Sequence, residues 1–123
     1  KKLLLSTYVA HGRGSGDNYA VAFSNRPGSY QSSLGFFRTG DTYMGKNGYS
    51  LFLDGLEKGI NDKARERAIV VHGANYADPA VLKGQQRLGR SLGCPALLPD
   101  ISKQVIDTIK GGVLLYIYGL NKA

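Results

Sequence analysis

The chain has 123 residues, of which 42% are hydrophobic and 20% charged, and its formal net charge is +7. This length and composition are typical of one domain with a buried core, which excludes a two-domain or a disordered protein. The longest apolar run, over 113–118, is far below the ~20 residues that a membrane-spanning helix needs. We therefore expect no transmembrane segment.

Strands dominate the predicted elements, because β-branched, aromatic and leucine residues cluster between Gly, Asn, Asp and Ser breaks. The expected strands cover 3–10, 19–23, 35–39, 49–53, 68–71 and 113–118. The 17 glycines also favour short strands and many turns. The sequence therefore predicts a mainly β fold.

One amphipathic helix is predicted near the C-terminus. Apolar residues recur at helical spacing over 101–109, after Pro99-Asp100 and before Gly111-Gly112, a typical helix end. Shorter helical turns are predicted over 61–67 and after Asp78-Pro79, where Asp can cap a helix and Pro can occupy its first position. We expect the main helix to pack on the sheet.

The composition also argues against several kinds of ligand. The basic residues are scattered along the chain, which argues against a nucleic-acid reader with a clustered basic stripe. The glycine-rich segment 12–16 lacks the Gly-Lys-Ser/Thr ending of a phosphate-binding loop. The single cysteine provides no Cys/His ladder for a structural zinc ion. We therefore predict no metal site and no cofactor.

Cys94 is the main candidate nucleophile. Gly93 before it permits tight backbone geometry, and Pro95 after it fixes φ, so the turn can direct the amides of Gly93 and Cys94 into one small space. Such amides can stabilise the oxyanion formed when a thiolate attacks a carbonyl, at ~3–4 kcal/mol per well-placed donor. The alternative is a buried, unreactive cysteine, the commoner state of a lone thiol.

His72 is the candidate general base, because it ends the apolar stretch 68–71 and is followed by Gly73, where the backbone can turn. A thiol needs a neighbouring imidazole or cation to favour the thiolate, and His72, Arg87 and Arg90 are candidates. Arg90 is alternatively a ligand for a substrate carboxylate or a solvated charge of the loop.

Ser91, Tyr76 and His11 are further candidates for substrate binding. Tyr76 follows His72 by four positions and is placed to line a peptide groove. His11 lies beside the glycine-rich segment, and a structural or substrate-gating role is expected for it rather than catalysis.

Five segments, in order, resemble the bacterial murein L,D-transpeptidases, in particular a divergent subfamily with a Ser-Leu-Gly-Cys-Pro motif. They are Ala-His-Gly-Arg-Gly-Ser-Gly at 10–16, Gly-Tyr-Ser-Leu at 48–51, Gly-Leu-Glu at 55–57, Ala-Ile-Val-Val-His-Gly-Ala at 68–74 and Gly-Arg-Ser-Leu-Gly-Cys-Pro at 89–95. The better-known branch carries Ser/Thr-His-Gly-Cys. Ser91, Gly93 and Cys94 fit that pattern, whereas Leu92 replaces its second histidine.

The resemblance implies a β-sandwich-like catalytic domain over 1–123 whose first strand we expect to precede Lys1. It also implies that a backbone carbonyl of Gly73 orients His72. The implied substrates are peptidoglycan stem peptides, and the implied location is the bacterial cell envelope, in the periplasm. Cys94 would form a thioester at the L-centre of the third-position diamino acid and release D-alanine.

The fate of that thioester separates two activities, since an acceptor amine gives a cross-link and water gives an L,D-carboxypeptidase. Two other classes stay open: a non-catalytic peptidoglycan-binding module, and an unrelated cysteine hydrolase of the sortase type. The sequence leaves the oligomeric state open.

Overall fold

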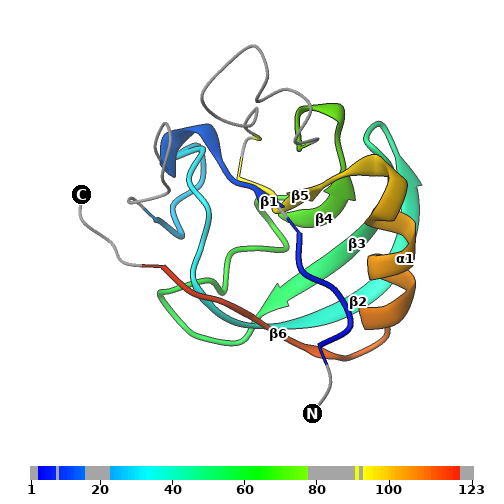
Figure 1. Cartoon of the computed structure of the whole chain (residues 1–123). Coiled ribbons are helices and arrows are strands. Elements are labelled where there is room, and N and C mark those ends of the chain that lie inside the picture. The colour runs from blue at the N-terminus through cyan, green and yellow to red at the C-terminus, as the bar shows by residue number, and fades with distance from the viewer. Residues whose placement is uncertain (1–2, 8, 16–22, 78–90, 92, 120–123) are drawn as a thin grey trace.

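The computed structural model of the chain describes residues 3–7, 9–15, 23–77, 91 and 93–119 (Figure 1). The strands in these residues form one six-stranded sheet in the order β1-β5-β4-β3-β2-β6. Neighbouring strands are antiparallel except for the parallel pair β4 and β5. The strands are β1 (Val9–Ala10), β2 (Gly35–Gly45), β3 (Gly48–Gly55), β4 (Val70–Gly73), β5 (Ala96–Leu97) and β6 (Leu114–Ile117). The predicted mainly β fold with one helix near the C-terminus is confirmed.

The hairpin of β2 and β3 lies between β4 and β6 in the sheet. Its tip is the turn Lys46-Asn47, and Gly48 after it has φ 83°, a left-handed conformation that glycine adopts without a steric cost. An irregularity between Thr39 and Thr42 shifts the pairing register with β3. Both strands are longer than predicted, because the hairpin continues past the core to a tip with exposed residues.

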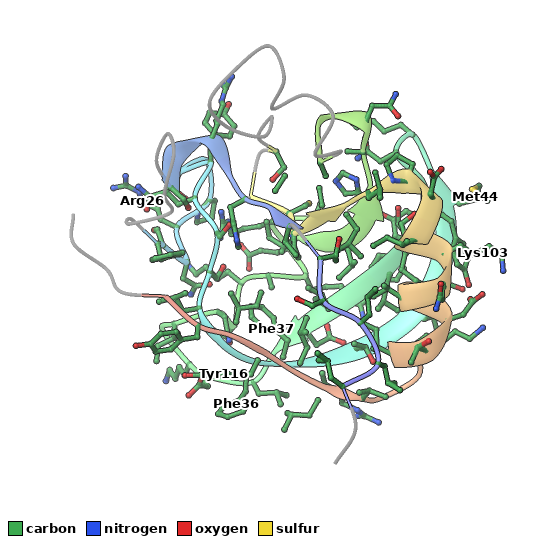
Figure 2. The ribbon with its side chains drawn as sticks, in the orientation of Figure 1. Arg26, Phe36, Phe37, Met44, Lys103 and Tyr116 are labelled. Carbon is green, nitrogen blue, oxygen red and sulfur yellow. The ribbon has the colours of Figure 1, made fainter. Side chains whose placement is uncertain are left out.

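The core lies between the sheet and the helix α1 (Pro99–Ile109). Alternate residues of a strand point to opposite faces, and Phe37 is therefore fully buried while Phe36 is 40% exposed. Figure 2 shows Phe37 inside the molecule and Phe36 beside Tyr116 at its surface. The apolar residues with 0% exposure are Phe37, Leu51, Leu53, Ala64, Ala77, Ala96 and Ile106.

The helix α1 covers β3 and β4; it ends at Ile109 as predicted, and it begins at Pro99, two residues earlier than predicted. Pro99 occupies its first turn, where a missing N–H costs nothing. At its other end, Thr39 Oγ1 donates to the Ile109 carbonyl at 2.6 Å and accepts from the Val113 amide at 2.9 Å. This buried hydroxyl ties the end of the helix to β2. Within the described residues, no helix has the length and apolarity to pass through a bilayer.

The predicted strand over 3–10 is wrong for residues 3–7, which form no strand. Only Val9–Ala10 has a partner, the two-residue strand β5, and Leu3 and Leu4 are each 78% exposed. A strand needs a neighbour to receive its backbone hydrogen bonds, so leucine content alone was misleading here. The predicted strand over 19–23 lies outside the described residues except for Phe23, which is in no strand.

Two predicted boundaries between 61 and 71 also change. The helix expected over 61–67 is a series of hydrogen-bonded turns, because the buried Asn61 side chain donates to the carbonyls of Leu34 and Phe36. Ala68 has φ 57°, so the strand expected from Ala68 begins at Val70 instead. The helical turn predicted after Asp78-Pro79 lies outside the described residues.

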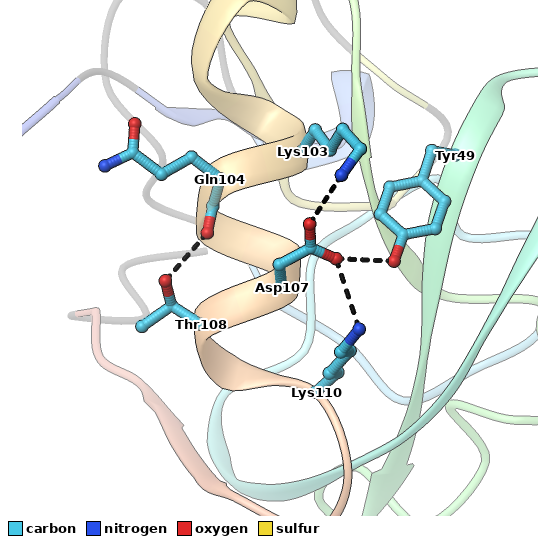
Figure 3. A network of polar contacts seen from close by, with 6 residues as sticks. All are labelled: Tyr49, Lys103, Gln104, Asp107, Thr108 and Lys110. Atoms are coloured by element: carbon cyan, nitrogen blue, oxygen red, sulfur yellow. Dashed lines mark hydrogen bonds and ion pairs between the residues drawn. The ribbon is translucent and has the colours of Figure 1, made fainter.

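A polar network joins α1 to β3 and makes the stability of the fold depend on pH (Figure 3). Asp107 accepts hydrogen bonds from Tyr49 at 2.6 Å and from Lys103 at 2.7 Å. The ammonium of Lys103, followed by the Tyr49 hydroxyl, holds the pKa of Asp107 well below its usual value of 3.8. A carboxylate with a depressed folded-state pKa stabilises the fold above its unfolded-state pKa, and this contribution is lost as the pH falls.

We therefore expect Asp107→Asn to lower the melting temperature at neutral pH, and the difference from the wild type to shrink as the pH falls from about 5 to about 2. Thermal melts of both proteins across this range measure the effect. Tyr49→Phe, which removes one of the three donors, is expected to lose a smaller part of the same pH dependence. A difference that stays constant down to low pH would contradict this account.

Candidate active site

The predicted nucleophile and base line one cavity of about 490 Å³. It is bounded by β4, by the turn that precedes β5 and by the tip of the β2–β3 hairpin. Its lining residues in the described chain are Tyr43, Lys46, Asn47, Arg67, Ala68, Ile69, Val70, His72, Ser91 and Cys94. Arg67 and Lys46 are cationic and no carboxylate is among these residues, so the cavity favours an anionic ligand.

Cys94 is held where β4 begins. The Val70 amide donates to its sulfur at 3.4 Å, and the thiol donates to the Ala68 carbonyl at 3.5 Å. Burial raises the pKa of the Cys94 thiol, while the Val70 amide and the Arg67 charge act in the opposite direction. The thiol is therefore mostly protonated at neutral pH, and a base must take its proton when it reacts.

His72 lies on β4 with 3% exposure, and it pairs with Ser50 of β3 on one side and Ala96 of β5 on the other. Its Nδ1 lies 2.9 Å from the Gly73 carbonyl. A carbonyl only accepts, so Nδ1 carries the proton and Nε2 keeps a lone pair. This arrangement gives the ring the tautomer that a general base requires.

Gly73 is required by packing as well. A Cβ at this position would lie 2.6 Å from Ser102 Oγ of α1, closer than real Cβ atoms come. The helix therefore approaches β4 closely just where the Gly73 carbonyl meets the imidazole.

Ser91 shapes the turn that presents Cys94. Its Oγ donates to the Cys94 carbonyl at 2.6 Å and accepts from the Gly93 amide at 3.1 Å. Its backbone is bound in turn by a parallel bridge to Gly12, through the His11 carbonyl at 2.9 Å and the Arg13 amide at 2.8 Å. Ser91 thus holds the nucleophile turn in place while it also lines the cavity.

The two predicted oxyanion donors differ in their surroundings. The Gly93 amide already donates to Ser91 Oγ. The Cys94 amide is not among the hydrogen-bonded donors of the described residues. Gly93 has φ 131°, which is unfavourable for residues with a Cβ, and a Cβ there would lie 2.9 Å from Ile69 Cδ1.

The predicted substrate-binding residues are less well placed. His11 is not among the cavity residues, and its Nδ1 lies 3.4 Å from Ser32 Oγ. Burial lowers the pKa of His11, which disfavours a charged ring. Tyr76 belongs to the short helix η2 (Asn75–Ala77), and its side chain lies outside the described part, as do Arg87 and Arg90.

Arg67, Lys46 and Tyr43 were not predicted as cavity residues. Lys46 and Tyr43 reach the cavity because the hairpin of β2 and β3 is longer than expected. The extra length follows from Asn47-Gly48, a dipeptide that favours hairpin turns. Arg67 carries no comparable local signal, because its place depends on a loop over 24–33 that is far from it in sequence.

Among the described residues, no group of three or more His, Cys, Asp or Glu side chains is arranged to hold a metal ion. Residues 1–118 match a protein-family model described as L,D-transpeptidase catalytic domain. Comparisons with curated proteins and with solved structures found no significant match.

Proposed function

The chain belongs to the L,D-transpeptidase catalytic domain family, and we propose that it is a cysteine acyltransferase that acts on peptidoglycan stem peptides through Cys94. The observation that carries this proposal is the cavity shared by Cys94 and His72, with Nδ1 of His72 bound to the Gly73 carbonyl. The family acts on the cell wall, so we further propose that the domain works in the bacterial cell envelope, in the periplasm.

In the proposed first step, Cys94 Sγ bonds to the carbonyl carbon at the L-centre of the third-position diamino acid. The thiol proton passes to His72 Nε2, because Nδ1 is already protonated. The carbon–nitrogen bond to the terminal D-alanine then breaks, and His72 returns the proton to the departing amine. The product is a thioester with neutral histidine.

In the second step, the amine of another stem peptide attacks the thioester, and His72 takes the proton of that amine. The carbon–sulfur bond breaks, and Cys94 regains a proton from the imidazolium. Water in place of the amine gives a shortened stem peptide, and the protein is then an L,D-carboxypeptidase. We propose cross-linking as the main outcome, in keeping with the family description.

The Cys94 amide is the first donor that we propose for the oxyanion of both steps. The Gly93 amide can join it only by giving up its bond to Ser91 Oγ, at 3.1 Å. We also propose that Lys46 and Arg67 draw the carboxylates of the stem peptide towards the cavity by their charge. The predicted roles of Tyr76, Arg90 and His11 in binding the peptide remain proposals.

Incubation with purified disaccharide-tetrapeptide, followed by mass spectrometry of the products, tests this function. A cross-linked dimer with loss of D-alanine is the expected product. The tripeptide alone would assign the carboxypeptidase activity. Unchanged substrate after incubation with correctly folded wild-type protein would contradict acyl transfer.

One observation favours a non-catalytic peptidoglycan-binding module as the second candidate, namely the burial that raises the pKa of the Cys94 thiol. Iodoacetamide labelling of the folded protein across pH separates the two candidates. If the protein is an acyltransferase, Cys94 is expected to be labelled faster in the wild type than in a variant without His72. If it is a binding module, Cys94 is expected to be labelled slowly in both proteins.

A further inference from the structure

Arg67 is a half-buried cation that the proposed mechanism does not use in a chemical step. It lies in the turns after β3 and lines the cavity together with Cys94. Its Nη1 donates to the Ser24 carbonyl at 2.9 Å and Ser33 Oγ at 3.0 Å. Its Nη2 donates to the Gln31 carbonyl at 2.7 Å and Ser29 Oγ at 3.3 Å.

These four bonds use every hydrogen on the two Nη atoms, so the guanidinium is fixed in position. They also leave no free fork with which Arg67 could grip a substrate carboxylate in the bidentate manner. All four acceptors are neutral hydroxyl or carbonyl oxygens. The charge itself is therefore not balanced by these contacts.

No carboxylate among the described residues forms an ion pair with Arg67. Burial lowers the pKa of Arg67, as expected for a cation without an anionic partner, and the ionised Cys94 thiol acts in the opposite direction. A Cβ placed on Gly93 would lie 3.2 Å from Arg67 Nη2, so the guanidinium lies directly behind the nucleophile turn. An anion formed at Cys94 would thus balance a charge that no carboxylate of the described residues pairs with.

We propose that Arg67 is a positioning residue whose fixed positive charge stabilises the thiolate of Cys94 as it forms. The inference rests on the proposed role of Cys94 and extends it, because His72 removes the proton while Arg67 stabilises the anion left behind. The loop over 24–33 takes part by holding the guanidinium against the nucleophile turn through its four acceptors.

Among the described residues, the other titratable or charged groups that line the cavity with Cys94 are His72 from β4, Tyr43 from β2 and Lys46 from the hairpin tip. Lys46 is exposed, so water and salt screen its effect on the thiolate. The half-buried Arg67 is screened much less. The two cations can therefore be distinguished by their sensitivity to ionic strength.

The test is a titration of the thiol in the full chain by the pH dependence of its iodoacetamide labelling, which the single cysteine makes specific. Arg67 favours the ionised form of Cys94 by its charge, so Arg67→Gln is expected to raise the midpoint by about one unit or more. At a pH well below the midpoint, the thiolate fraction then falls about tenfold or more. Arg67→Lys, which keeps the charge, is expected to keep the midpoint close to that of the wild type.

Arg65→Gln is the matched control. Arg65 lies two positions earlier in the same turns, but it pairs with Asp54 at 2.8 Å and stacks on Phe52 away from the cavity. This change is expected to leave the midpoint of the thiol titration equal to that of the wild type within experimental error. A parallel shift in Arg65→Gln would contradict a local effect of Arg67.

Ser29→Asp supplies a second route should Arg67→Gln fail to fold. It places a carboxylate beside Arg67 Nη2 without removing the guanidinium, so the positive charge is neutralised and the thiol midpoint is expected to rise. An unchanged midpoint in folded Arg67→Gln, or in Ser29→Asp, overturns the proposal. The titration needs no substrate, so its result is distinct from a failure of the protein to transfer acyl groups.

Discussion

Cys94→Ala is expected to abolish the covalent adduct between this protein and an acylating ligand. In the wild type, we expect a carbapenem or a stem tetrapeptide to add to Cys94 Sγ, and intact-protein mass spectrometry would detect the thioester. Alanine has no nucleophilic atom, and the chain has no second cysteine to replace it. The expected result is complete loss of the adduct and of every transfer product.

The fold is expected to survive this change, since Cys94 is partly buried and its sulfur makes only two weak hydrogen bonds. A circular dichroism spectrum and a melting curve provide the control. Cys94→Ser keeps the shape of the side chain and is expected to lose the adduct too, because a hydroxyl is far less ionised than a thiol. An adduct of unchanged yield in Cys94→Ala would remove Cys94 from its proposed role.

His72→Asn is expected to slow acylation by roughly 10²–10⁴-fold, the usual contribution of a general base. Asparagine is the informative replacement, because its amide can keep a donor near the Gly73 carbonyl while the proton-accepting Nε2 is lost. The buried position between Ser50 and Ala96 then keeps a polar side chain with a partner. Acylation rates from time-resolved mass spectrometry measure the change.

The pH profile separates a chemical from a structural role of His72. Without the base, the rate is expected to rise with pH through the ionisation range of the thiol itself, since thiolate then forms without help. A merely misfolded variant would be slow at every pH. Wild-type rates in a folded His72→Asn protein would exclude His72 as the base.

The sequence predicted those elements whose signal is local. Pro99-Asp100, the spacing of the isoleucines and Gly111-Gly112 together indicate α1, which is confirmed, although it begins at Pro99 rather than after Asp100. The central strands are confirmed for the same reason, since their apolar runs end in turn residues. Where the interpretation depended on a distant partner, as for residues 3–7, it was wrong.

The candidate site divides in the same way. Cys94, His72 and Gly73 stand out because glycine and proline next to a reactive side chain are visible in the sequence, and their catalytic roles remain predictions. Arg67 could not be found in this way, because its neighbours come from a loop about forty positions earlier. The left-handed backbone of Ala68, which places the Cys94 acceptor, likewise has no signal in an alanine.

The pairing of β1 with β5 affects how late in synthesis the fold around Cys94 can be completed. Val9 and Ala10 pair with Leu97 and Ala96, and Gly12 pairs with Ser91. Residues 9–12 can complete these contacts only after the segment with Ser91, Ala96 and Leu97 has been made, and such distant pairings form slowly. A fragment that stops before Ser91 would thus leave Val9, Ala10 and Gly12 without the partners that they have in the folded domain.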